Sequence, residues 1–117
     1  MNTKALQQAI RVLRTVPDHL FDMHVYATDT DCGTTACIAG HCALDPWFQA
    51  QGLILICDPK RSRYPTYNGE TDLIALAFFF QLNETTARRL FLACAPQTPR
   101  EAIAHIETIL ATGTLPE

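Results

Sequence analysis

Leu73-Ile74-Ala75-Leu76-Ala77-Phe78-Phe79-Phe80 is the longest apolar run of this 117-residue chain. Thr71 or Asn68 can cap a helix that contains the run and extends to Leu82. Because the run is apolar on all sides, we expect the helix to be buried on most of them. A run of eight residues is too short to span a bilayer, which takes about 18 or more. We therefore expect a core helix and no membrane partner.

Helices with local start and stop signals are predicted on both sides of this run. Residues 3–15 carry apolar side chains every three or four positions, which is typical of an amphipathic helix. Asn83 can cap a helix over residues 84–95. The sequence Thr98-Pro99-Arg100-Glu101 is a capping box, and it opens a further helix that Gly113 ends.

The region between residues 18 and 67 is less regular. Residues 18–31 form a short turn of helix and an irregular acidic loop in this interpretation, and helices are expected over 34–44 and 47–51. Residues 53–57 and 64–67 can pair as a hairpin. The fold class predicted is mainly α: a compact bundle of about five to six helices with one small β-hairpin. We expect a single globular domain over residues 1–117.

The composition is that of a globular protein with few charges. Hydrophobic residues make up 48% of the chain and charged residues 18%, and the net charge is −3. This charge has the wrong sign for nucleic-acid binding through a basic surface. The first residues lack the apolar stretch of a secretion signal, so we expect a cytoplasmic protein whose cysteines are thiols. No cofactor is expected.

Residues 31–42 hold three of the five cysteines and one of the four histidines. On a helix that begins at Thr34, Cys37 and His41 share a face, and Cys32 could fold back to complete part of a zinc site. Paired Cys-x-x-Cys motifs are missing, however, so no metal is the favoured interpretation. A disulfide between Cys32 and Cys37 is a further alternative in an oxidising environment.

The same window can also be interpreted as catalytic or as structural. Cys32 or Cys37 could act as a nucleophile with a histidine as base, but no thiol-enzyme signature surrounds them, and we expect no enzyme. Small residues four apart, such as Ala36 and Gly40, favour close packing instead. The expected neighbour is the helix over residues 73–80.

Residues 76–90 follow the pattern of a helix-turn-helix unit, which gives an alternative DNA-binding function. Gln81 stands where glycine is usual in the turn. Arg88 and Arg89 would supply positive charge to the second helix, while Glu84 lies at its start. The match is therefore incomplete.

Charge is distributed unevenly between two predicted surface segments. The 58–67 hairpin is basic and carries two tyrosines, whereas the 18–31 loop is acidic. This arrangement suits an electrostatically steered protein partner. Because residues 73–80 hold more apolar surface than one small domain readily hides, a homodimer is a further expectation. The candidate partner-binding residues are Asp29, Asp31, Lys60, Arg61, Arg63, Tyr64 and Tyr67.

Three segments, CGTTACIAG (32–40), FFFQLNETTARRLF (78–91) and TPREAIAHIETIL (98–110), resemble small uncharacterised helical proteins of bacteria and their phages. Those proteins share a Cys-Gly-Thr-x-x-Cys-x-Ala-Gly segment, and no activity is carried over with the resemblance. The setting of those proteins implies a phage or prophage accessory factor. Such a factor would inhibit a bacterial defence complex by binding to it and occluding its surface. The leading prediction is thus a non-enzymatic protein-interaction module. The alternatives are a helix-turn-helix DNA-binding regulator and a zinc-stabilised module. The motif positions are Cys32, Gly33, Thr34, Cys37, Ala39, Gly40, Leu82, Ala87, Leu90 and Phe91.

Overall fold

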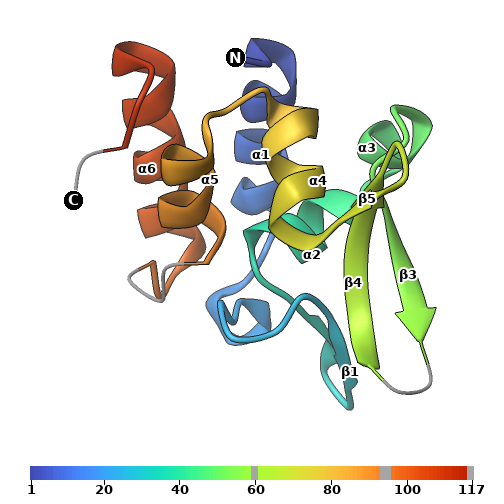
Figure 1. Ribbon diagram of the computed structural model, residues 1–117. Helices are drawn as coiled ribbons and strands as arrows, with labels where there is room; N and C mark the ends of the chain where they lie inside the picture. Colours follow the sequence, from blue (N-terminus) through green and yellow to red (C-terminus); the bar gives the residue numbers. More distant parts are fainter. Residues whose placement is uncertain (59–60, 93–95, 116–117) are drawn as a thin grey trace.

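The computed structural model describes residues 1–58, 61–92 and 96–115, with the backbone alone for Asp58, Arg61 and Ser62. Helix α4 (Asp72–Phe80) lies at its centre, between a small sheet on one side and a group of helices on the other (Figure 1). That group contains α1 (Thr3–Arg14), α5 (Glu84–Phe91) and α6 (Pro99–Thr112). Two short helices, α2 (Ile38–Ala43) and α3 (Pro46–Ala50), connect it to the sheet.

The sheet beside α4 is antiparallel, with the strand order β3-β4-β5. Strands β3 (Ile54–Asp58) and β4 (Arg61–Tyr67) form the hairpin that the sequence predicts. The short strand β5 (Glu70–Thr71) pairs with the end of β4 and leads directly into α4. A second, separate hairpin is formed by β1 (Thr28–Thr30) and β2 (Gly33–Thr35).

This architecture corrects the predicted fold class. The chain is 53% helical and 18% strand, with two small sheets, and is a mixed α/β protein rather than a mainly α bundle. The error lies chiefly in residues 28–35, because Thr28, Thr30, Thr34 and Thr35 form strands instead of a loop and a helix start. Threonine is branched at Cβ and favours extended backbone over helix. The helix expected from Thr34 therefore begins only at Ile38.

The start of α5 and both ends of α6 agree with the capping signals in the sequence. The Asn83 side chain accepts a hydrogen bond of 2.8 Å from the backbone N–H of Thr86, and Thr98 accepts one of 3.2 Å from that of Glu101. Gly113 ends α6 with a φ of +83°. These interactions are local, so the sequence alone can predict them.

The core is a cluster of aromatic rings around Phe80, which is fully buried. Its ring centroid lies 5.1 Å from that of Phe79, 5.1 Å from that of Phe91 and 5.9 Å from that of Phe48. These rings come from α3, α4 and α5, and aromatic pairs at such distances add to the energy of area burial. Leu55 of β3 and Tyr67 of β4 pack against the same core, which therefore joins the helices to the sheet.

Candidate functional site

The cysteine segment (residues 31–42) does not form one long helix, because α2 begins only after Cys37. Cys37 is the N-cap of α2 and is only 2% exposed, and its backbone N–H donates to the Val25 carbonyl over 3.0 Å. Burial raises the pKa of the Cys37 thiol to about 11, and it also raises the pKa of Cys42. Both thiols are therefore protonated at neutral pH, which is unsuited to nucleophilic catalysis.

His41 connects α2 to the loop that follows α1. Its Nε2 donates to the Leu20 carbonyl oxygen over 2.7 Å, and its ring stacks on Phe21 with centroids 6.5 Å apart. Burial lowers the pKa of His41. The neutral ring fits this position, because its N–H is satisfied and a charge there would be partly removed from water.

The described residues contain no cluster of three or more His, Cys, Asp and Glu side chains that could hold a metal ion. Cys32, the conditional ligand from the sequence, lies exposed in the turn between β1 and β2, whereas Cys37 is buried at the start of α2. Both are free thiols. His41 uses Nε2 for the Leu20 carbonyl instead of a metal.

The close packing predicted at Gly40 is present, but its neighbour is different. A Cβ atom on Gly40 would lie 1.5 Å from the carbonyl oxygen of Tyr26 and 2.8 Å from the Cβ of Ala36. The close approach is therefore to the backbone before β1, and not to the helix over residues 73–80. Glycine is required because any side chain would overlap the Tyr26 carbonyl.

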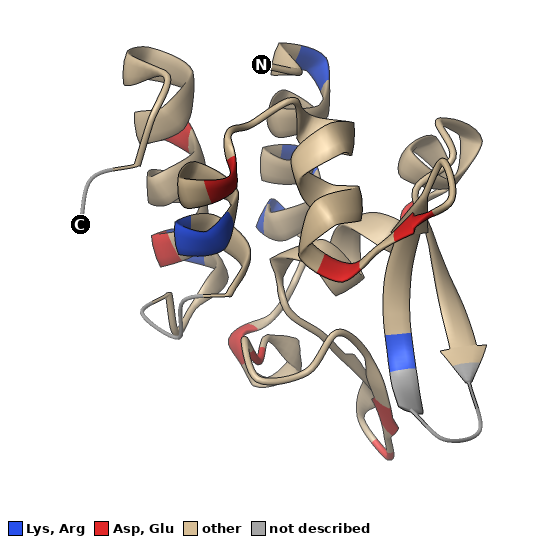
Figure 2. Cartoon of the chain, viewed as in Figure 1, with Lys and Arg blue, Asp and Glu red and all other residues tan. Residues whose placement is uncertain are grey.

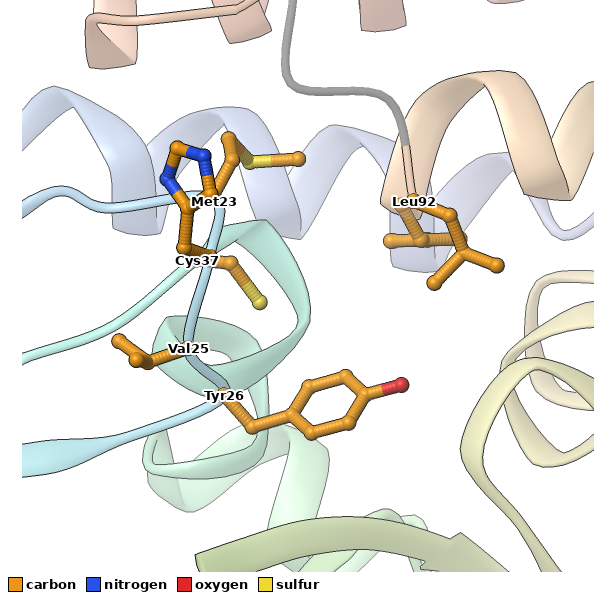
Figure 3. A pocket seen from close by; sticks show the side chains of 7 residues that line it. Met23, Val25, Tyr26, Cys37 and Leu92 are labelled. Carbon is orange, nitrogen blue, oxygen red and sulfur yellow. The ribbon is translucent and has the colours of Figure 1, made fainter.

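A pocket of about 160 Å³ lies beside Cys37. Figure 3 shows Cys37 and Leu92 on opposite sides of this pocket. His24, which also lines it, pairs with the carboxylate of Asp22 over 3.0 Å. The pocket combines the protonated thiol of Cys37 with the His24 ring and with mostly apolar side chains. Its lining residues are Met23, His24, Val25, Tyr26, Cys37, Phe91 and Leu92.

Helices α4 and α5 form a tight corner in which Gln81 adopts the left-handed conformation, with φ +53° and ψ +49°. Gln81 thus has the backbone geometry that glycine usually supplies in a helix-turn-helix unit. The two arginines of α5 both bind within the chain. Arg88 pairs with Glu84 over 2.7 Å, and Arg89 donates to the Leu115 carbonyl over 2.9 Å. These contacts within the chain leave less of the positive charge of Arg88 and Arg89 available for binding DNA.

The two charged segments predicted to bind a partner lie side by side. Arg63 of β4 donates to the carboxylate of Asp29 in β1 over 2.6 Å, so the basic and acidic segments meet in an ion pair. Figure 2 shows the basic residue of β4 near the acidic end of the β1–β2 hairpin. The hydrogen bonds from Arg63 and Thr34 hold the pKa of Asp29 below its usual range.

The remaining predicted partner-binding residues occupy different environments. The Tyr67 ring packs edge-on against Phe79 with centroids 5.0 Å apart, which makes it part of the core boundary. Tyr64 is half-buried, opposite Ile56 in the sheet, and Asp31 is exposed in the β1–β2 turn. Lys60 and the side chain of Arg61 lie outside the described residues.

An apolar face on α4 is the surface feature that the individual site predictions missed. Phe78 is 61% exposed and Ile74, one turn earlier, is 56% exposed. With Leu73, Ala77 and Leu82 they line a pocket of about 260 Å³, and Glu84 completes its rim. We refer to Leu73, Ile74, Ala77, Phe78 and Leu82 as the α4 face. Its signal in the sequence is the excess of apolar residues over what one domain buries.

Comparisons with known proteins identified no relative of this chain. No family model matches the chain, and no curated protein or solved structure is significantly similar to it. None of the helices in the described part of the chain is both long enough and apolar enough to cross a bilayer.

Proposed function

We propose that this protein is a non-enzymatic interaction module that binds a protein partner through the α4 face. The observation that carries the proposal is the exposure of Phe78 and Ile74 beside an apolar pocket. Large apolar side chains grouped on the surface of a small domain are typical of interaction sites, whereas scattered ones are not. An aromatic residue beside a pocket is also the usual composition of an energetic hot spot.

The side chains around the α4 face indicate the chemistry of the partner. Asp72 lies at the start of α4, and Glu84 lines the pocket itself. Glu84 pairs with Arg88 over 2.7 Å, so the rim of the pocket carries an ion pair, and the apolar side chains decide what the face can bind. The partner that fits is a protein segment with a leucine or aromatic anchor. Such binding would act by occluding the surface that supplies the anchor.

The biological setting follows from the sequence resemblance as part of the same proposal. An accessory factor that blocks a bacterial defence complex needs a compact body and an exposed binding face, without catalytic groups. The free thiols of Cys32, Cys37, Cys42 and Cys57 are compatible with the reducing cytoplasm in which such a factor would act.

The experiment is photo-crosslinking in a bacterial host from a benzoylphenylalanine placed at position 78. We expect a covalent adduct with a specific host protein, and no such adduct from the same probe at the exposed position of Glu107 on α6. Phe78→Asp should abolish co-purification of that protein. Because Phe78 is exposed, the variant should lose no more than about 1–1.5 kcal/mol of unfolding free energy, mostly from lower helix propensity and from a negative charge in the last turn of α4.

A charge-reversal variant tests the competing assignment, in which the partner binds to the two hairpins. Arg63→Glu breaks the ion pair with Asp29 without touching the α4 face. If Arg63→Glu abolished partner binding while Phe78→Asp preserved it, the binding surface would be the hairpin pair and the assignment to α4 would be wrong. Retention of binding by Arg63→Glu supports the α4 face.

A further inference from the structure

Strand β3 forms an outer edge of its sheet. The strand order is β3-β4-β5, and in the ranges that the structure describes no other strand pairs with the second side of β3. Figure 1 shows β3 at the side of the molecule farthest from the helices α5 and α6. An edge strand presents unpaired backbone groups, which can accept another strand.

The backbone groups of Leu55 are the ones that face this open side. Leu55 lies opposite Pro65 of β4, and proline has no N–H to donate. In an antiparallel ladder, hydrogen-bonded and non-hydrogen-bonded pairs alternate, so Leu55 and Pro65 form a non-hydrogen-bonded pair. The N–H and C=O of Leu55 therefore point away from β4. Those of Ile54 and Ile56 point toward it.

From Ile54 to Cys57 the β3 edge lacks the charges that usually prevent strands from pairing, and the charged residue of the strand, Asp58, stands at its end. No charged residue occurs from Pro46 to Cys57. The strand β1 carries Asp29 at its middle position, and the two-residue strand β5 carries Glu70. On β3 itself the side chains directed to solvent are apolar, with Ile54 40% and Ile56 37% exposed. Natural edge strands of this kind are normally protected by charge or by a partner.

We propose that two copies of this chain pair through β3, antiparallel, about a two-fold axis at Leu55. Each Leu55 N–H donates to the Leu55 carbonyl of the second copy, so the two sheets become continuous. Ile54 then lies opposite the partner subunit's Ile56, and the reverse pair is identical by symmetry. Cross-strand pairs of β-branched residues stabilise such an arrangement.

The geometry favours a second copy over an unrelated strand. A two-fold axis at Leu55 makes the edge self-complementary, because the same residue supplies donor and acceptor on both sides. Antiparallel pairing also sends the charged end of each hairpin, where Asp58 is opposite Arg61, away from its equivalent in the other copy. A strand of five residues buries less than the roughly 1,200–2,000 Å² of a standard interface, so the dimer should be reversible.

Sedimentation velocity over a range of concentrations tests the pairing. We expect the unmodified protein to change from monomer to dimer as its concentration rises. The double variants Ile54→Lys/Ile56→Lys and Ile54→Glu/Ile56→Glu should each remain monomeric, because like charges would lie opposite across the two-fold axis. Their equimolar mixture should form the dimer again. Ile74→Lys on the α4 face is the matched control and should dimerise normally.

Amide hydrogen exchange provides a readout that needs no variant. The Leu55 amide should exchange quickly at low concentration and slowly at high concentration, whereas the Ile56 amide is protected by β4 in both states. A monomer at all concentrations would overturn the proposal, as would a Leu55 amide whose exchange is independent of concentration. Loss of the dimer in Ile74→Lys, with the β3 variants still dimeric, would also overturn it. The partner-binding function of the α4 face is tested separately and would not be affected.

Discussion

A methyl group on Gly40 would overlap the carbonyl oxygen of Tyr26. We predict that Gly40→Ala lowers the unfolding free energy by about 1–3 kcal/mol or more, because α2 and the loop before β1 must separate. Urea denaturation measures the change. Gly69→Ala is the comparison: its φ of +87° costs about 1 kcal/mol of backbone strain, but nothing lies within 4 Å of the added Cβ. Unchanged stability in Gly40→Ala would show that the Tyr26 loop yields without cost.

Because the pKa of His41 is lowered in the folded chain, the unfolding free energy depends on pH. The folded chain binds the proton less readily than the unfolded chain, whose His41 has a pKa near 6.5. The contribution of neutral His41 is therefore complete above pH 6.5 and is lost as the pH falls from there toward the folded pKa. We predict a melting temperature that declines from about pH 7 to about pH 5, and a shallower decline in His41→Gln. Parallel profiles would contradict this role.

At the scale of the helices, two C-caps adopt the left-handed conformation with different residues. Gln81 ends α4 with a φ of +53°, and Gly113 ends α6 with a φ of +83°. Glycine adopts this conformation without the strain that a Cβ introduces. We predict that Gln81→Gly raises the unfolding free energy by about 0.5–1 kcal/mol, while Gly113→Ala lowers it by about 1 kcal/mol.

Chemical denaturation of both C-cap variants in parallel measures these opposite changes. Far-UV circular dichroism provides the control that the helix content is preserved. A decrease in stability for Gln81→Gly would mean that the glutamine side chain contributes more than its backbone strain costs.

Several helix caps and one hairpin could be predicted from the sequence. The caps at Asn83, Thr98 and Gly113 and the hairpin of β3 and β4 are confirmed, because each depends on residues close together in the chain. The pairing of β1 with β2 was not predicted from the sequence. Residues 28–35 lack the alternation of apolar and polar residues that indicates a half-buried strand.

At the scale of the whole molecule, two phenylalanines of α4 have opposite environments. Phe80 is fully buried among Phe48, Phe79 and Phe91, whereas Phe78 is 61% exposed. We predict that Phe80→Ala lowers the unfolding free energy by about 3–5 kcal/mol. Phe78→Ala should change it by less than about 1 kcal/mol.

Guanidinium denaturation, followed by circular dichroism and by Trp47 fluorescence, measures both variants. One core joins helices and sheet, so the two signals should change in a single transition, as expected for one domain. Separate transitions would contradict the single-domain prediction. Equal losses in the two variants would show that Phe78 is covered in solution.

The sequence by itself determined where most helices begin and end, which apolar segment forms the core, and that this segment has more apolar surface than the domain can bury. These properties depend on capping, turn and hydrophobic patterns between near neighbours in the chain. Only the tertiary structure decided that Gly40 packs on Tyr26, that Asp29 pairs with Arg63, and that the side of α4 with Phe78 stays exposed. Such contacts join residues distant in sequence, and they depend on how all the elements pack at once.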